Sequence, residues 1–87
     1  MVDIKNLVAT VGINIKLART SKRWTQKQLS DNCGLTEASI SQMENGLHYN
    51  VSVFSLVKIV NSLGNIEITD LFTPMVIGNK VNEAVKS

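Results

Sequence analysis

The sequence predicts an all-α domain, a compact bundle of four to five helices. Apolar residues recur at spacings of three and four in successive segments, which is the helical period. Ser, Thr and Gly stand at the boundaries of these segments, where helices are capped. No segment shows the strict alternation of a strand. With 87 residues, of which 44% are hydrophobic, the chain is long enough for one small domain.

Composition excludes several classes of protein. No apolar run approaches the roughly 20 residues that cross a bilayer, and the first residues lack a signal-peptide pattern. We therefore expect a cytoplasmic protein. A single cysteine, Cys33, excludes a disulfide framework and a cysteine-based zinc site. His48 is the only histidine, and no carboxylate cluster accompanies it, so we expect no metal, no cofactor and no enzymatic activity.

The first predicted helix runs from Val2 to about Lys22, with Asp3 as a plausible N-cap. Its apolar residues at helical spacing are predicted to face inward: Ile4, Leu7, Val8, Val11, Ile15 and Ala18. Gly12 weakens the middle of this helix by up to about 1 kcal/mol relative to Ala. The first ten residues are therefore expected either to continue the helix or to form a separate turn or frayed arm.

Two short helices are predicted between Thr25 and Gly46, on either side of a glycine turn. Thr25 and Thr36 stand at N-cap positions, and Gly34 permits the left-handed conformation that ends a helix. The inward positions are Leu29, Cys33, Leu35, Ile40 and Met43. The outward face of the second helix of the pair is small and nearly uncharged: Glu37, Ala38, Ser41 and Gln42, with Ser39 near its boundary.

A fourth helix is predicted for residues 53–63, capped by Ser52 and ended by Gly64. Its predicted apolar stripe contains Val53, Leu56, Val57, Val60 and Leu63, widened by Phe54 and Ile59. A last short element lies within Asn65–Phe72, where Thr69 is a candidate cap. We divide the chain into a domain of residues 1–73 and a tail of residues 74–87, which is either a weak amphipathic helix or disordered.

Positive charge is concentrated just before the helix pair. Lys16, Arg19, Lys22, Arg23 and Lys27 fall in a stretch without acids, whereas no Lys or Arg lies between Gln28 and Val57. A basic patch of this kind is typical of a nucleic-acid-binding surface. Cations also favour a helix C-terminus, so a solvated helix end explains the charge equally well.

From about residue 11 to residue 72 the sequence resembles the Cro/cI-type, or XRE-like, helix-turn-helix family. An ordered series of residues carries the resemblance: Ile15, Arg19, Thr25-Gln26, Leu29, Gly34, Leu35-Thr36, Ser39-Ile40-Ser41, Met43-Glu44-Asn45-Gly46, and Ser52 to Leu63-Gly64. The resemblance implies a lambda-repressor-like DNA-binding domain that binds double-stranded DNA as a homodimer, with its third helix in the major groove.

The resemblance also assigns roles to individual residues. Thr36, Glu37, Ala38, Ser39 and Gln42 are expected to contact bases. The residues expected at phosphates are Gln26, Thr25, Lys22, Arg23, Lys27, Tyr49 and Asn50. Arg19 and Glu44 match a buried ion pair between the first and third helices. The chain departs from the family in three places: the loop of residues 47–51 lacks Lys and Arg, the stretch after Gly64 is one residue longer, and the tail has no counterpart.

These observations favour a small transcriptional regulator, acting as a repressor or autoregulator on a pseudo-palindromic operator. Its dimer contact is expected in Asn65–Phe72, with the tail as a second candidate. The alternative is a protein-interaction module that holds another regulator and does not itself bind DNA. The neutral outward face and the loop without Lys or Arg favour this alternative.

Overall fold

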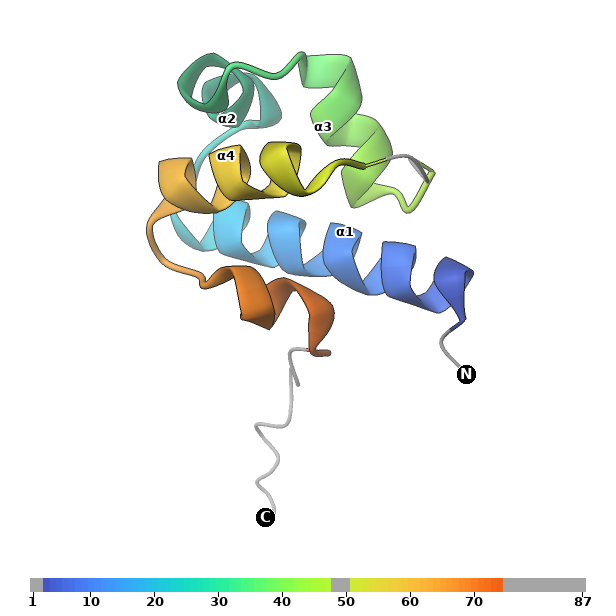
Figure 1. The fold of residues 1–87 in the computed structure, drawn as a ribbon. Helices are drawn as coiled ribbons and strands as arrows, with labels where there is room; N and C mark the ends of the chain where they lie inside the picture. Colours follow the sequence, from blue (N-terminus) through green and yellow to red (C-terminus); the bar gives the residue numbers. More distant parts are fainter. Residues whose placement is uncertain (1–2, 48–50, 75–87) are drawn as a thin grey trace.

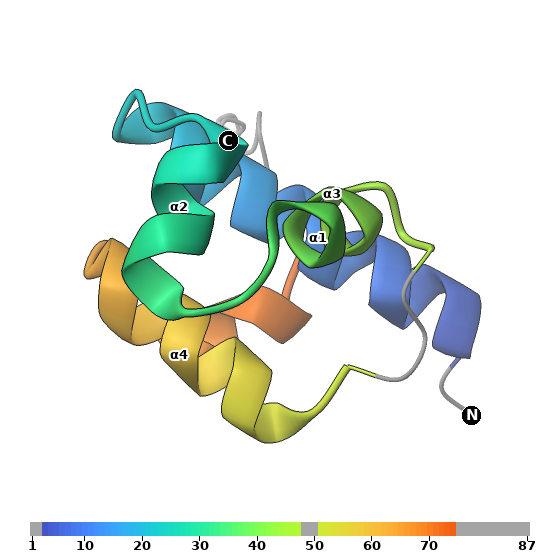
Figure 2. The same ribbon diagram turned by 90° about the horizontal axis from the view of Figure 1, so that it is seen from above.

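A computed structural model of the protein describes residues 3–47 and 51–74. In chain order these residues form α1 (Ile4–Ser21), α2 (Gln26–Cys33), α3 (Glu37–Glu44), α4 (Val53–Leu63) and the short 3-10 helix η1 (Ile68–Phe72). In Figure 1, α2 and α3 lie on one side of α1 and η1 lies on the other, while Figure 2 shows α4 running beside α1. The all-α fold predicted from the sequence is confirmed.

The helix boundaries follow from side-chain caps. The side chains of Thr25, Thr36 and Ser52 each accept a hydrogen bond from the backbone N–H three residues later, which satisfies a donor that the helix leaves free. Asp3 caps α1 by accepting from the N–H of Lys5 at 3.0 Å. Gly34 ends α2 in the left-handed conformation, with a φ of 81°. The capping pattern in the sequence therefore predicted these boundaries.

Gly12 lies inside an uninterrupted α1, so the expectation of a separate N-terminal turn is wrong. Its role is to let α1 approach α3. A Cβ atom at Gly12 would lie 2.1 Å from the carbonyl oxygen of Met43, which is backbone and cannot rotate away. The glycine is thus required by the α1–α3 contact, and the intrinsic weakness of glycine in a helix is secondary.

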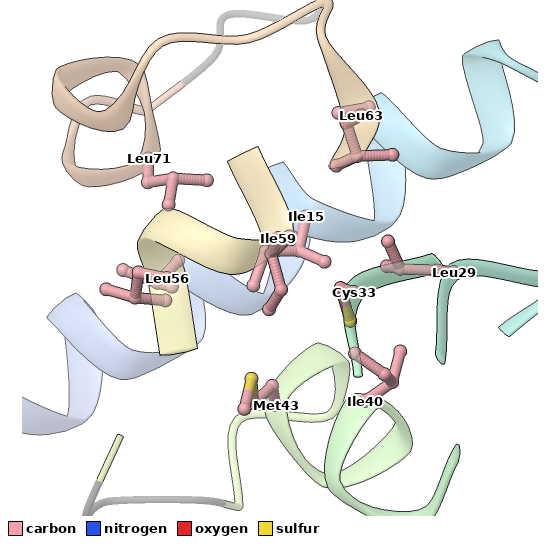
Figure 3. Packing of buried hydrophobic residues seen from close by; sticks show 11 residues of the cluster. Ile15, Leu29, Cys33, Ile40, Met43, Leu56, Ile59, Leu63 and Leu71 are labelled. Atoms are coloured by element: carbon pink, nitrogen blue, oxygen red, sulfur yellow. The ribbon is translucent and has the colours of Figure 1, made fainter. Parts of the chain in front are cut away.

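The core is aliphatic and collects side chains from every helix. Figure 3 shows side chains of α1, α2, α3 and α4 converging, with Leu71 of η1 beside them. The buried apolar side chains are Val11, Ile15, Ala18, Leu29, Cys33, Ile40, Met43, Leu56, Ile59, Leu63 and Leu71. Leu35 packs against this cluster, as predicted, and Trp24 packs against it as well. The core joins the helix pair α2–α3 rigidly to α1 and α4.

The structure corrects the predicted inward face of α4. Val53 is 66% exposed, Phe54 is 80% exposed and Val57 is 38% exposed, although all three were predicted in the apolar stripe. Seven of the eleven residues of α4 are apolar, so the stripe is wider than the face that α1, α2 and η1 cover. Ile4, also predicted inward, is 65% exposed at the start of α1. The chain therefore presents apolar side chains that its own core does not use.

The element after α4 is held to α1 by a buried amide. Asn14 is 1% exposed, and its Nδ2 donates to the backbone oxygens of Leu71 at 2.8 Å, Thr73 at 2.9 Å and Asp70 at 3.0 Å. η1 begins at Ile68, so Thr69 lies inside it and is not the cap that the sequence suggested. A buried polar residue needs partners, and here those partners fix the path of the chain after α4.

Candidate nucleic-acid interface

Side-chain hydrogen bonds lie at both ends of α2. Thr25 and Gln28 form a capping box at the start of α2, in which the Thr25 N–H donates to Gln28 Oε1 at 2.7 Å and the Gln28 N–H donates to Thr25 Oγ1 at 3.0 Å. At the other end, Ser30 Oγ donates to the Leu35 carbonyl at 2.7 Å across the turn. The Ser30–Leu35 bond links α2 to the turn that leads into α3.

One side of α3 is exposed and nearly neutral. Glu37, Ala38 and Gln42 are exposed, and Thr36 is exposed at the N-cap. Ser39 is half-buried, and its hydroxyl oxygen accepts from Thr36 Oγ1 at 3.0 Å. Of the five residues expected to contact bases, Thr36 and Ser39 therefore form hydrogen bonds at the N-cap of α3. Glu37, Ala38 and Gln42 are exposed and lie outside this cap.

A buried ion pair joins the end of α3 to α1. Arg19 Nε donates to Glu44 Oε2 at 2.7 Å and Arg19 Nη2 donates to Glu44 Oε1 at 3.0 Å, with side-chain exposures of 10% and 2%. Arg19 Nη1 also donates to the Trp24 carbonyl at 2.6 Å. This two-point contact is the geometry in which Arg binds a carboxylate most strongly. The pair expected from the sequence is present, and it places Arg19 inside the protein.

Gln26 connects this ion pair to the start of α2. Its Nε2 donates to Glu44 Oε1 at 3.0 Å, so Glu44 accepts from both Arg19 and Gln26. Gln26 is half-buried at the first position of α2. The bond to Glu44 uses one of the two hydrogens of the Gln26 amide. The second hydrogen can donate, and the amide oxygen can accept, a further hydrogen bond. The sequence did not predict this contact between α2 and α3.

The predicted cations occupy different surroundings. Lys22 Nζ donates to the Leu63 carbonyl at 2.6 Å and lies 4.3 Å from the centre of the Trp24 ring, so it caps the C-terminal end of α4. This contact differs from the phosphate contact expected for Lys22. Lys27 is exposed and forms a surface ion pair with Asp31 at 3.3 Å, a contact that contributes little energy.

Arg23 is exposed and has a φ of 61°, in the left-handed region that favours glycine. Its backbone N–H donates to the Thr20 carbonyl at 2.9 Å as α1 ends. A non-glycine residue in this conformation costs about 1–2 kcal/mol. The chain thus holds a charged side chain at a position where glycine would be more stable.

The match to a protein-family model settles the family. A model described as helix-turn-helix matches residues 15–71. These residues contain all of α2, α3 and α4, the ion pair Arg19–Glu44 and most of η1. The chain belongs to the XRE-type helix-turn-helix family. The resemblance stated from the sequence is confirmed.

Known proteins of this helix-turn-helix family are similar in sequence and fold. A hypothetical transcription factor from Neisseria meningitidis serogroup B is 31% identical over 62 residues, which are 71% of this chain and 58% of that protein. The crystal structure of the hypothetical transcription factor NHTF from Neisseria has a TM-score of 0.74 at 27% identity and covers 99% of this chain and 90% of that one.

The restriction-modification controller protein C.AhdI from Aeromonas hydrophila has a TM-score of 0.69 at 29% identity. The match covers 75% of this chain and 96% of the controller. The part of this chain outside that match has no aligned counterpart in C.AhdI.

Several predicted features remain outside the described residues. Tyr49 and Asn50, expected at phosphates, fall there, as do His48 and residues 75–87 of the tail. Within residues 3–47 and 51–74, no group of three or more potential ligands is arranged to hold a metal ion. In the same residues, no helix has both the length and the apolar character that crossing a bilayer requires. Cys33 is a buried thiol of the core.

Proposed function

We propose that the protein is a sequence-specific DNA-binding transcriptional regulator that places α3 in the major groove. The observation that carries this proposal is the exposed face of Glu37, Ala38 and Gln42 on a helix whose other side is fixed by the core and the Arg19–Glu44 pair. A Gln amide can bond adenine at two points, a Glu can accept from the cytosine amino group, and an Ala can contact the thymine methyl.

Phosphate contacts are proposed at the N-terminus of α2. Its first turn contains no acid, and its free backbone N–H groups favour an anion. Thr25 and Gln26 lie at this end, and the exposed cations Arg23 and Lys27 lie on either side of them in the sequence. The Glu44–Gln26 bond orients the Gln26 side chain, so the ion pair that positions α3 also positions this phosphate contact. Phosphate contacts supply affinity and register without selecting sequence.

The strained backbone of Arg23 supports a role for this residue in DNA affinity. Backbone strain of this kind persists where the surrounding structure imposes it and is frequent at functional sites. Glycine at position 23 would remove the conformational strain, but it would also remove the positive charge. An arginine kept at this position beside α2 is what a phosphate contact requires, since each neutralised phosphate releases counterions.

We further propose that the regulator acts as a homodimer on a pseudo-palindromic operator, as a repressor or an autoregulator. The contact expected in Asn65–Phe72 can use few of its apolar residues, because Leu71 is fully buried and Ile66 and Ile68 pack against the core. Phe72 is 43% exposed and remains available. The exposed face of α4, with Val53, Phe54 and Val57, is the larger candidate surface.

The same exposed face of α4 favours the second candidate function, a module that holds another regulator. A gel-shift titration of the full chain on random and genomic DNA fragments over a salt series distinguishes the two. A DNA-binding regulator should bind with an affinity that falls steeply with salt. Absence of salt-dependent binding at micromolar protein would contradict the first proposal and favour the module.

A further inference from the structure

The exposed polar side chains of α3 are mainly hydrogen-bond acceptors. Within α3, only Glu37 and Gln42 are both polar and exposed. An ionised carboxylate accepts hydrogen bonds and does not donate, whereas an amide has an accepting oxygen and a donating nitrogen. Residues 36–45, which are α3 and its two caps, contain no Lys, Arg or His. The side chains that most often bind the acceptor atoms of guanine, Arg and Lys, are therefore absent from this helix.

The hydroxyl groups beside these two side chains already form hydrogen bonds within the protein. Thr36 Oγ1 donates to Ser39 Oγ at 3.0 Å and accepts from the Ser39 N–H at 3.0 Å. Ser41 is half-buried, and its Oγ accepts from Asn45 Nδ2 at 3.5 Å. The hydrogen bonds that α3 can offer to DNA bases therefore come mainly from the exposed glutamate and glutamine.

Acceptors on the protein require donors on the bases. In the major groove these donors are the N6 amino group of adenine and the N4 amino group of cytosine. Watson–Crick pairing uses one hydrogen of each amino group, and the other hydrogen points into the groove. Because the pairing hydrogen is kept, a methyl group on the amino nitrogen replaces the hydrogen in the groove. Methylation thus removes the donor and places bulk where the protein acceptor would lie.

A two-point contact between Gln42 and adenine is the contact most sensitive to this change. The amide oxygen accepts from adenine N6 while the amide nitrogen donates to N7, so both bonds need the amide close to the base edge. A methyl group on N6 occupies the place of the amide oxygen and prevents both bonds. Glu37 precedes Gln42 by about 7.5 Å along the helix axis, so the two side chains reach different base pairs.

The backbone of α3 has little freedom to withdraw from an added methyl group. On its inner side, Ile40 is 0% exposed and Met43 is 3% exposed. At its end, Glu44 is bound to Arg19 in the buried ion pair. Only the side chain of Gln42 can move away from the base, and this movement breaks its contacts with adenine.

We propose that methylation of exocyclic amino groups in the operator blocks binding by this regulator, with N6-methyladenine at the base contacted by Gln42 as the main determinant. N4-methylcytosine at the base contacted by Glu37 acts in the same way through the carboxylate. The inference rests on the proposed function, because it requires α3 to lie in the major groove. The ligand is therefore double-stranded DNA with unmethylated amino groups, and a DNA amino-methyltransferase that acts on the operator would control binding.

Binding of the full chain to synthetic duplexes tests the proposal. The probe is the site that the chain selects from a random pool of DNA, prepared unmodified and with N6-methyladenine at each adenine in turn. At one adenine of each half-site, we expect fluorescence anisotropy titrations to show an affinity loss of about 5–150-fold, the discrimination that one two-point contact supplies. Sequence-specific binding that is equally tight for every methylated duplex would overturn the proposal and leave the proposed function intact.

A variant separates the role of the side chain from the effect of methylation on the duplex itself. Gln42→Ala should bind the unmodified duplex and the duplex methylated at the sensitive adenine equally. Asn61→Ala, at an exposed amide of α4, is the matched control and should keep the full sensitivity. Sensitivity that persists in Gln42→Ala would overturn the proposal. A chain without preference for any sequence in the unmodified pool would overturn the proposed function and this inference together.

Discussion

Replacing Gly12 with alanine should destabilise the protein, although alanine is the better helix former. In an unpacked helix this change would stabilise by about 1 kcal/mol. Here the new Cβ would meet the Met43 carbonyl oxygen at 2.1 Å, whereas ordinary contact begins at 3.4 Å. The α1 and α3 backbones would have to separate by the difference, 1.3 Å. Such a separation loosens the core cluster to which α1 contributes Ile15 and α3 contributes Ile40 and Met43.

Forced overpacking of a core typically costs 1–3 kcal/mol, and a backbone obstacle leaves little room for relaxation. We expect a net loss of about 2 kcal/mol, which lowers Tm by about 8–16 °C in a domain of this size. Thermal unfolding followed by circular dichroism measures the shift. Asn6→Ala, at an exposed position of the same helix, is the control and should leave Tm equal or slightly higher. A rise in Tm for Gly12→Ala would refute the close α1–α3 approach.

Three further changes test other parts of the structure. Glu44→Gln leaves the buried Arg19 without its counter-charge and should lower the free energy of unfolding, measured in urea, by about 3–5 kcal/mol. The double change Arg19→Met with Glu44→Leu should lower it by less than Glu44→Gln does. A larger loss for the double change would contradict a buried ion pair. Arg23→Gly should raise the free energy of unfolding by about 1 kcal/mol. It should also reduce the slope of log K for DNA binding against log salt concentration by about 1. An unchanged slope would exclude Arg23 from the phosphate contacts. Phe54→Lys places a charge on the exposed face of α4 and should convert a dimer to a monomer in sedimentation equilibrium. Lys16→Gln, at an exposed position of α1, is the control. An unchanged dimer with Phe54→Lys would exclude this face.

The sequence predicted those features that depend on local chemistry. The caps at Thr25, Thr36 and Ser52 act within three residues, so their positions in the sequence define the starts of α2, α3 and α4. Gly34 and Gly64 end α2 and α4 in the left-handed conformation, which also depends only on the residue at that position. The helix order and the α2–α3 pair followed from these signals.

The features that were missed depend on contacts between distant residues. Gly12 was treated as a weak point because the Met43 carbonyl lies 31 positions away in the sequence. The contact of Lys22 with the Leu63 carbonyl was not predicted, because the two residues are 41 positions apart in the sequence. The stripe of α4 was predicted too wide, since apolar content alone does not show which side α1 and α2 cover. Asn14 gave no signal, because its three acceptors are backbone oxygens of η1 and the residue after it.

Selection of bound DNA from a random pool tests the role of α3 most directly, performed in parallel with the full chain and with Gln42→Ala. We expect the chain to enrich an inverted repeat whose half-site centres lie one helical turn apart, about 10 base pairs. Gln42→Ala should relax the preference at one base pair of each half-site and cost about 1–3 kcal/mol on the preferred site. Asn61→Ala, an exposed amide on α4, should leave the motif unchanged. A pool without enrichment, or the same motif with the same affinity for Gln42→Ala, would contradict base contact by this face of α3.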